Sequence, residues 1–198
     1  TTALPPKPAM LDFLNPPQRA AVLHAQGPLL VLAGAGSGKT RVIVEKIGYL
    51  IDSGRYVPRR IAAITFTNKS AKEMRERVAK RLRADVAAEV TICTFHALGL
   101  KFLQIEHASV GLKRSFSIFD ADDASAQIKD LLGGTNAKPD DIEDVKNLIS
   151  RAKNSGLSPE QAMAVARSSR EKNAAMVYEL YQARLTAFNA VDFDDLIR

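Results

Sequence analysis

The chain has 198 residues, of which 46% are hydrophobic and 25% are charged, and its formal net charge is +6. This composition excludes a disordered protein, and the length is sufficient for one large domain or two small ones. The single cysteine, Cys93, excludes an internal disulfide framework and indicates a reducing compartment. No apolar run approaches the roughly 20 residues that cross a membrane, and no signal pattern is seen, so we expect a cytoplasmic protein.

The charge is unevenly distributed along the chain. Residues 1–110 contain 16 Lys and Arg against 8 Asp and Glu (+8), whereas residues 111–198 contain 12 against 14 (−2). This asymmetry predicts that the first part faces a polyanion and that the second is an ordinary solvated unit. A basic protein without a nucleic-acid role remains the alternative.

Ordered structure is expected to begin at Leu11, because residues 1–10 are rich in proline and predict a flexible lead. Asn15 followed by Pro16 is typical of a helix start. In that short helix, the amide donor and acceptor of Gln18 are suited to reading the edge of an adenine ring. A plain surface position is the alternative for Gln18.

A phosphate-binding loop is predicted between the apolar run at residues 29–32 and a helix that begins near Lys39. The apolar run suits a central parallel strand that is buried on both faces. Glycines at alternating positions let the backbone turn its N–H groups inward, and the positive end of the helix faces the same anion. The loop consists of Ala33, Gly34, Ala35, Gly36, Ser37, Gly38, Lys39 and Thr40.

The end of this loop indicates a nucleotide rather than an unspecified anion. Lys39 is expected to reach the β and γ phosphates of a nucleotide, and the Thr40 hydroxyl is expected to ligate Mg²⁺, so these two residues are the catalytic candidates. Ala33 departs from the general pattern, which has glycine at that position. An ordinary glycine-rich turn would explain the glycines but not the Lys-Thr pair.

The order strand, loop, helix occurs three times, at spacings of roughly 30 residues, as in a doubly wound parallel sheet. After the phosphate loop, a second buried strand is predicted at residues 61–66, followed by a basic helix at 69–83. A third strand is predicted at residues 90–93, followed by a helix at 97–107. Right-handed crossovers would place all three loops along one edge of an α/β fold, which is where ligands bind.

From about Ala108 the pattern changes to helices, with one short strand-like run at residues 116–119. The periodicity predicts a separate helical subdomain at residues 109–190. The segment Asp192-Phe193-Asp194-Asp195 follows it and is a candidate source of catalytic carboxylates. No apolar strand of four or more residues precedes them, so we interpret Asp192 as the cap of a new helix. The helices of the subdomain are predicted at residues 123–132, 139–153, 158–168 and 172–189.

Several motifs, in their order and spacing, resemble the Q motif and motifs I, Ia and Ib of superfamily 1 DNA helicases of the UvrD/Rep/PcrA type. In that family the phosphate loop begins with alanine, as it does here at Ala33. The resemblance extends from Leu14 to the end of the chain, and residues 61–67 and 96–99 are most similar to the Rep branch. The motifs are Asn15-Pro16-Pro17-Gln18, residues 33–41, residues 65–71 with Glu73-Met74, and Thr94-Phe95-His96.

The resemblance implies an ATP-dependent 3′-to-5′ DNA helicase that uses ATP and Mg²⁺ and acts on single-stranded DNA and on single-strand/duplex junctions in replication or repair. It implies a RecA-like ATPase domain at residues 11–108, an inserted helical domain at 109–190 and a return to the first domain at 191–198. Gln18 would contact adenine, and the loop with Arg41 would hold the phosphates. The DNA contacts would be Phe66, Thr67, Asn68, Lys69, Thr94 and His96. Core packing is the alternative for Phe66, and helix support is the alternative for His96.

Hydrolysis of ATP also needs a carboxylate on magnesium and a group that orients the attacking water. The family supplies both from an Asp-Glu segment that does not occur here, and it unwinds DNA with a second RecA-like domain. We therefore expect a monomeric part of a longer helicase that binds nucleotide and DNA but is inactive alone. The motor of a helicase–nuclease or repair complex is one alternative, and an unrelated P-loop kinase or GTPase is another.

Overall fold

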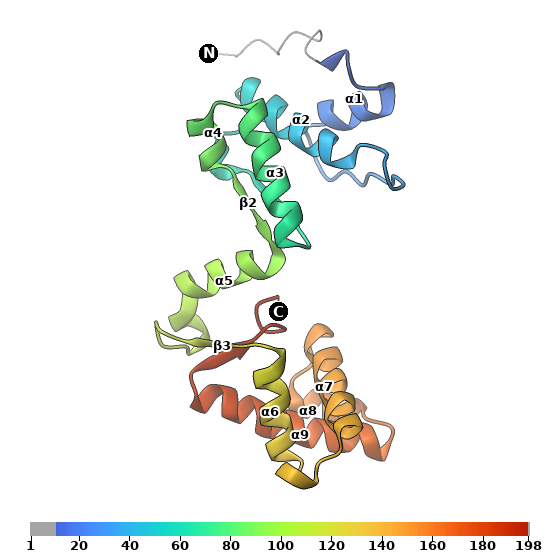
Figure 1. Cartoon of the computed structure of the whole chain (residues 1–198), viewed down its shortest axis with the longest axis vertical. Helices are drawn as coiled ribbons and strands as arrows, with labels where there is room; N and C mark the ends of the chain where they lie inside the picture. Colours follow the sequence, from blue (N-terminus) through green and yellow to red (C-terminus); the bar gives the residue numbers. More distant parts are fainter. Residues whose placement is uncertain (1–10, 198) are drawn as a thin grey trace. The chain divides into compact units, whose positions relative to one another are not determined.

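The computed structural model describes residues 11–197, and the predicted flexible lead lies outside them. The chain is an α/β protein with short parallel strands, and it divides into two compact units (Figure 1). The first unit ends at Thr94 and the second begins at Phe95. Each unit has its own hydrophobic core, so the packing of each follows from its own residues.

The first unit combines two parallel strands with helices that pack against them. Ala62 lies opposite Thr91, and Thr65 lies opposite Thr94. Residues of both strands and of α2 and α3 form one core, with Val78 fully buried. The elements are α1 (Pro16–Leu23), α2 (Lys39–Asp52), the 3₁₀ turn η2 (Pro58–Arg60), β1 (Ala62–Thr65), α3 (Asn68–Arg81), α4 (Ala84–Glu89) and β2 (Thr91–Thr94).

The prediction of a buried strand at residues 29–32 is wrong. These residues have no regular secondary structure, and Leu30 and Leu32 are 82% and 86% exposed. A strand needs a neighbour that accepts and donates its backbone hydrogen bonds. Among residues 11–197, β1 pairs only with β2, and neither strand pairs with this run. Apolar composition alone therefore did not suffice to form a strand.

Local capping explains where the helices of the first unit begin. The predicted start of α1 is confirmed, because the Asn15 Oδ1 atom accepts the Gln18 backbone N–H at 3.0 Å in a capping box. The Thr67 hydroxyl accepts the Ser70 N–H at 3.1 Å and caps α3. The sequence did not predict α4, a helix of six residues.

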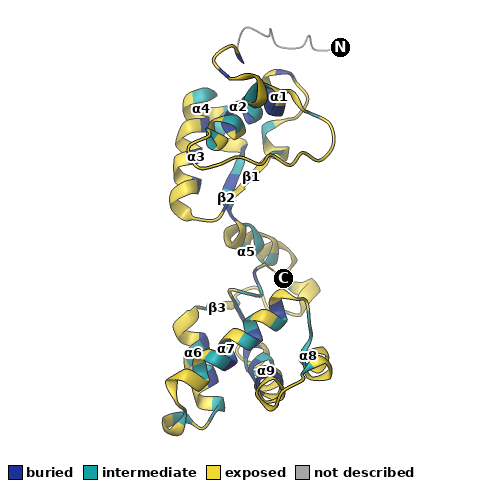
Figure 2. Ribbon diagram, turned by 90° about the vertical axis from the view of Figure 1, so that its right-hand side faces the viewer, coloured by how far each residue is buried: buried dark blue, intermediate teal, exposed yellow. Residues whose placement is uncertain are grey.

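The second unit is mainly helical. Its core lies among α6, α7 and α9, whose facing sides are coloured as buried (Figure 2). Tyr178, Tyr181 and Leu185 of α9 are almost fully buried. The four helices predicted for this region are confirmed, with ends that differ by a few residues. The elements are α5 (Phe95–Glu106), η3 (His107–Val110), β3 (Ser117–Phe119), α6 (Ala121–Leu131), η4 (Gly134–Asn136), α7 (Pro139–Asn154), α8 (Pro159–Val165), α9 (Ser169–Ala187) and β4 (Ala190–Asp192).

The prediction that a helix begins at Asp192 is wrong. Residues 190–192 form β4, which runs parallel to β3 with Phe119 opposite Asp192. Asn189 has a left-handed backbone (φ 49°), and this conformation turns the chain out of α9 into the strand. After the strand, a turn brings the Asp195 N–H to the Asp192 Oδ1 atom at 3.0 Å, so Asp192 caps a turn instead of a helix.

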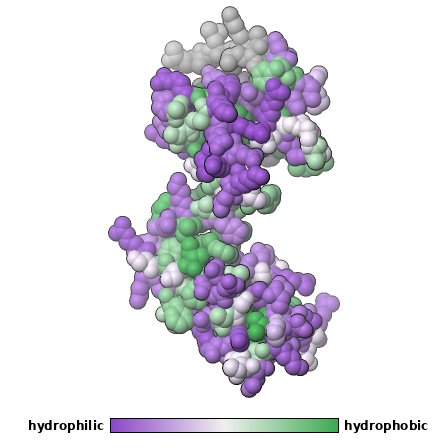
Figure 3. All heavy atoms as spheres, viewed as in Figure 1, coloured by the Kyte–Doolittle hydropathy of each residue, from purple (hydrophilic) through white to green (hydrophobic). Residues whose placement is uncertain are grey.

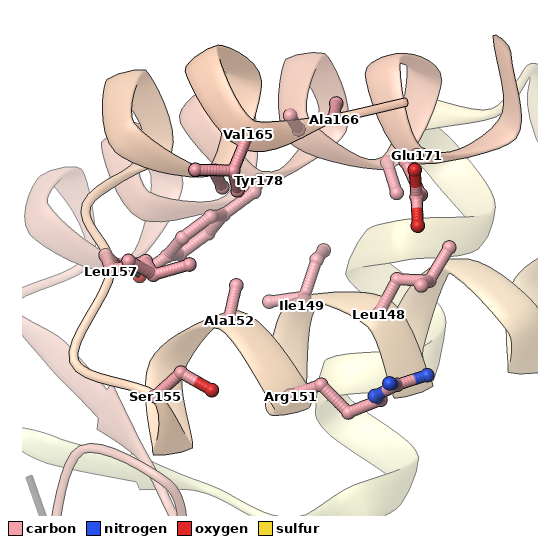
Figure 4. A pocket seen from close by; sticks show the side chains of 13 residues that line it. Leu148, Ile149, Arg151, Ala152, Ser155, Leu157, Val165, Ala166, Glu171 and Tyr178 are labelled. Carbon is pink, nitrogen blue, oxygen red and sulfur yellow. Dashed lines mark hydrogen bonds between the residues drawn. The ribbon is translucent and has the colours of Figure 1, made fainter. Parts of the chain in front are cut away.

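A gap of about 180 Å³ lies among α7, α8 and α9, and the side chains of Ile149, Leu157 and Tyr178 face it (Figure 4). It is smaller than the roughly 300–1,000 Å³ of typical ligand pockets, and its lining is mostly apolar. We interpret it as imperfect helix packing. No helix within residues 11–197 has both the length and the apolar character that a bilayer crossing requires.

Candidate nucleotide and nucleic-acid site

The glycine-rich loop has the backbone that an anion nest requires. Gly36 and Gly38 adopt left-handed conformations (φ 74° and 83°), and the Ser37 hydroxyl donates to the Gly34 carbonyl at 2.7 Å. No side chain caps the amino end of α2, so its first N–H groups remain oriented toward the loop. A Cβ atom at Gly34 or Gly36 would meet nothing within 4 Å, so the loop is open on one side. This arrangement fits a phosphate chain.

Lys39, the first residue of α2, reaches back across the loop. Its Nζ atom donates to the Ala33 carbonyl at 2.9 Å and to the Gly34 carbonyl at 2.6 Å. Both acceptors are neutral carbonyls, and an anionic acceptor binds an ammonium group more strongly than a neutral one. The ammonium group of Lys39 thus lies over the glycine-rich loop, and its role as a phosphate ligand stays a prediction.

Gln18 connects α1 to the loop. Its Nε2 atom donates to the Ser37 carbonyl at 3.0 Å, and its Oε1 atom accepts the Asn15 N–H at 3.2 Å. Gln18 and Lys39 line a cleft of about 450 Å³ whose other walls come from the apolar run and from α2. Part of the wall is apolar, which suits a nucleobase next to a phosphate site.

The other two residues predicted to contact the nucleotide or its metal ion are Thr40 and Arg41. Thr40 is half-buried in the first turn of α2, beside Lys39. Residues 11–197 contain no group of three or more His, Cys, Asp or Glu side chains that could hold a metal ion. The Arg41 guanidinium lies 4.6 Å from the centre of the Phe13 ring, and this contact turns it toward Phe13.

The predicted DNA-contacting residues of the first unit follow β1 and β2. Phe66 comes directly after β1, and its ring is 88% exposed, so it does not pack in the core. The Thr67 hydroxyl is engaged in capping α3, while Asn68 and Lys69 are exposed in the first turn of that helix. Thr94 is buried at the end of β2. The parallel register brings the carboxyl ends of both strands to one edge, where an aromatic ring, an amide and a basic group are presented together.

His96 lies in the first turn of α5 in the second unit, beside an aromatic residue that the sequence analysis missed. The rings of His96 and Phe193 are 5.7 Å apart and meet edge to face at 72°. Phe193 comes directly after β4 and is 47% exposed. The available signal was an aromatic residue at the end of a strand, as at Phe66. It was overlooked because β4 was not recognised.

The carboxylates near the end of the chain are used within the second unit. Lys153, whose side chain is fully buried, donates to Asp192 at 2.8 Å and to Asp195 at 2.9 Å, and the Tyr181 hydroxyl donates to Asp192 at 3.0 Å. Burial opposes the charged form of Asp192, but the ammonium of Lys153 and the hydrogen bonds around it lower the pKa of that carboxyl. Burial and the neighbouring carboxylates raise the pKa of Tyr181. This buried cluster is structural.

Comparison with known proteins identifies the family of this chain. Residues 14–198 match a family model described as the UvrD/REP helicase N-terminal domain. The chain therefore has the character of a helicase domain, and it belongs to the UvrD/Rep helicase family. The resemblance seen in the motifs is confirmed.

Three curated relatives illustrate the similarity. The ATP-dependent DNA helicase Rep of Escherichia coli (strain K12) is 49% identical over 191 residues, covering 93% of this chain and 28% of the relative. The ATP-dependent DNA helicase PcrA of Leuconostoc citreum is 41% identical over 190 residues, covering 95% and 25%. The PcrA of Staphylococcus aureus (strain Mu50 / ATCC 700699) is 41% identical over 191 residues, covering 96% and 26%. The chain thus spans about a quarter of the length of these relatives.

Proposed function

We propose that this chain is the nucleotide-binding part of an ATP-dependent DNA helicase. The observation that carries the proposal is the loop at residues 33–40, where left-handed glycines turn the backbone and the Lys39 ammonium reaches back over the loop beside a partly apolar cleft. The family match and the names of the relatives support ATP as the nucleotide. Gln18 would turn its amide toward the adenine, and the loop would hold the β and γ phosphates. Bound Mg²⁺ would offset the phosphate charge, with Thr40 as its protein ligand.

We assign residues 11–108 and 191–198 to a RecA-like domain and residues 109–190 to an inserted helical subdomain. The parallel pairing of β1 with β2 and the βα order of the first unit support this assignment. The compact units divide at Thr94, so α5 lies between that division and the proposed domain boundary.

Single-stranded DNA is the proposed polymer substrate, including single-strand/duplex junctions. Phe66 would stack on a base at the edge formed by β1 and β2, and Asn68 and Lys69 would contact phosphates. His96 would contribute from α5, with Phe193 against its ring. Movement in the 3′-to-5′ direction, a role in replication or repair and a cytoplasmic location are the finer parts of the proposal, and they rest on the family resemblance.

The nucleotide site is tested with Lys39→Ala and a fluorescent ATP analogue in the presence of Mg²⁺. Removal of a charged donor from phosphate should weaken binding by about tenfold to a hundredfold, which corresponds to the roughly 1.5–3 kcal/mol of such a hydrogen bond. Lys72→Ala is the matched control, because Lys72 is exposed on α3 of the same unit. Equal affinities for the Lys39 variant and the control would contradict the assignment.

A further inference from the structure

A second basic surface lies on the first unit, away from the strand edge that the proposed function uses. It is a cleft of about 450 Å³ around η2, between the end of α2 and the start of β1. Because it precedes β1, it is at the amino ends of the parallel strands, whereas Phe66 is at the carboxyl ends. We call it the arginine cleft, and it is lined by Gly54, Arg55, Tyr56, Val57, Arg59 and Arg60.

The positive charge of the arginine cleft is not neutralised within the described chain. Arg55, Arg59 and Arg60 are all exposed, and within residues 11–197 none of the three forms an ion pair. The carboxylate that precedes the cleft, Asp52, is bonded at 2.9 Å by Arg81 of α3. Three guanidinium groups therefore face solvent in one hollow that no acidic residue lines.

The backbone that carries these arginines is fixed by hydrogen bonds. Gly54 takes a left-handed conformation (φ 66°) that ends α2, and the Tyr56 N–H donates to the Leu50 carbonyl at 3.2 Å. The Ile61 N–H donates to the Pro58 carbonyl at 3.0 Å and closes the 3₁₀ turn before β1. A ligand would need to order only side chains, so little binding energy is lost to ordering the chain.

We propose that the arginine cleft binds the phosphodiester backbone of DNA, and this inference rests on the proposed function. A guanidinium group matches two phosphate oxygens with two parallel donors, and it remains charged at any physiological pH. The Tyr56 ring, 46% exposed, adds a surface for stacking on a base and a hydroxyl for a phosphate. Residues 11–94 carry 14 Lys and Arg against 7 Asp and Glu (+7), which favours a nucleic acid over an acidic protein segment.

The position of the cleft predicts an extended footprint on DNA. Arg60 and Phe66 flank β1, and six residues of extended chain correspond to about 20 Å. One DNA molecule that contacts both places must run along this unit. An oligonucleotide of about 30 nucleotides, longer than the roughly 4–16 that one binding module covers, is therefore the suitable probe.

The test compares wild type with the triple variant Arg55→Ala, Arg59→Ala, Arg60→Ala, using fluorescence anisotropy over a salt series. Single-stranded DNA and a duplex of the same sequence are titrated separately, to distinguish the two sources of phosphate. The slope of log affinity against log salt should fall in magnitude by about 2 for a single strand or by about 3 for a duplex, since three phosphate contacts are lost. A fall in either titration supports the proposal.

The matched control removes three exposed lysines from the second unit, as Lys129→Ala, Lys138→Ala, Lys172→Ala. Its slope should stay within one unit of wild type. The pair Arg59→Lys, Arg60→Lys keeps the charge and should retain most of the slope, which separates a binding defect from a folding defect. Equal slopes for wild type and the triple variant, or an equal loss in the lysine control, would overturn the proposal.

Two further readouts distinguish DNA binding at the arginine cleft from recognition of acidic protein and from failure of the proposed function. If the triple variant loses affinity only for polyglutamate, the cleft recognises acidic protein and the DNA proposal is overturned. If wild type and the triple variant bind ATP and DNA equally well, the assignment of DNA binding to the arginine cleft is wrong and the proposed function stands. Wild type that binds neither would instead contradict the proposed function.

Discussion

Each unit contains a lysine whose ammonium group donates to two oxygen acceptors, but the acceptors differ in charge and in burial. In the first unit, the Lys39 Nζ atom is exposed and donates to two neutral carbonyls of the glycine-rich loop. In the second unit, the Lys153 Nζ atom is buried and donates to two carboxylates. An anionic ligand can replace the two neutral carbonyls that Lys39 contacts. The two carboxylates that Lys153 contacts cannot be lost without leaving a buried charge unpaired. Lys39 can thus exchange its hydrogen-bond acceptors for a ligand, whereas Lys153 keeps its acceptors.

The surfaces of the two units repeat this contrast. Polar side chains cover α3 of the first unit, whereas apolar side chains gather around α5 and β3 of the second (Figure 3). On α5, Phe102 and Ile105 are 60% and 68% exposed, and no residue of that helix is buried.

The largest expected effect comes from breaking the buried cluster. Lys153→Met leaves Asp192 and Asp195 buried without their counter-ion, and it should lower the free energy of unfolding of the second unit by about 3–5 kcal/mol. Urea denaturation followed by circular dichroism measures this change. Lys146→Met is the control, because its ion pair with Glu143 lies at the surface and should contribute little to stability. Similar losses for both variants would contradict the contrast drawn above.

A smaller effect is expected from filling space at glycines of the two units. In Gly99→Ala, the new methyl group would overlap the Leu196 carbonyl oxygen, so unfolding should become easier by about 1–3 kcal/mol. In Gly34→Ala, the methyl group meets no atom within 4 Å and the backbone is not left-handed, so the change should stay within about 0.5 kcal/mol. Thermal denaturation of both variants measures the difference. Equal shifts would mean that α5 does not approach the final turn as closely as described.

The smallest effect is a dependence on alkaline pH that belongs to the second unit. Burial and the neighbouring carboxylates raise the pKa of Tyr181 above its ordinary value, so the folded state keeps this hydroxyl protonated. Its stabilising contribution is complete below the unfolded pKa of about 10 and is lost as the pH rises toward the folded pKa. Wild type should lose up to about 1.4 kcal/mol more than Tyr181→Phe for each pH unit above 10. Parallel pH profiles for the two proteins would show that Tyr181 ionises as freely as an exposed tyrosine.

The predictable parts of the fold are those that depend on near neighbours in sequence. Ser158 and Ser168 accept N–H groups three residues further on and cap α8 and α9, and the helices predicted at residues 158–168 and 172–189 are found within a few residues of those bounds. Strands depend on partners that lie far away. The run at residues 29–32 is apolar but unpaired in the described chain, whereas Ala190–Asp192 is only three residues long and is a strand because β3 lies beside it.

In the candidate site, too, the features formed by near neighbours in sequence were predictable and the contacts between distant residues were not. The glycines and Lys39 identify the phosphate loop because the loop is contiguous. The bond from Gln18 to Ser37 joins residues 19 positions apart, and the edge contact of His96 with Phe193 joins two ends of a unit. No local pattern contains those distances, so the sequence proposed Gln18, Ser37 and His96 without their contacts, and it did not propose Phe193.

If Gln18 contacts the base as proposed, nucleotide affinity is linked to the stability of α1. Its amide has both ends in use, one in the capping box of α1 and the other on the loop. A nucleobase that takes the place of the Asn15 N–H on this amide would release the capping bond, and a neutral hydrogen bond of about 1 kcal/mol corresponds to roughly fivefold in affinity. The amino end of α1 then loses protection whenever the base is bound. Amide hydrogen exchange at that end would therefore report on the occupancy of the nucleotide site.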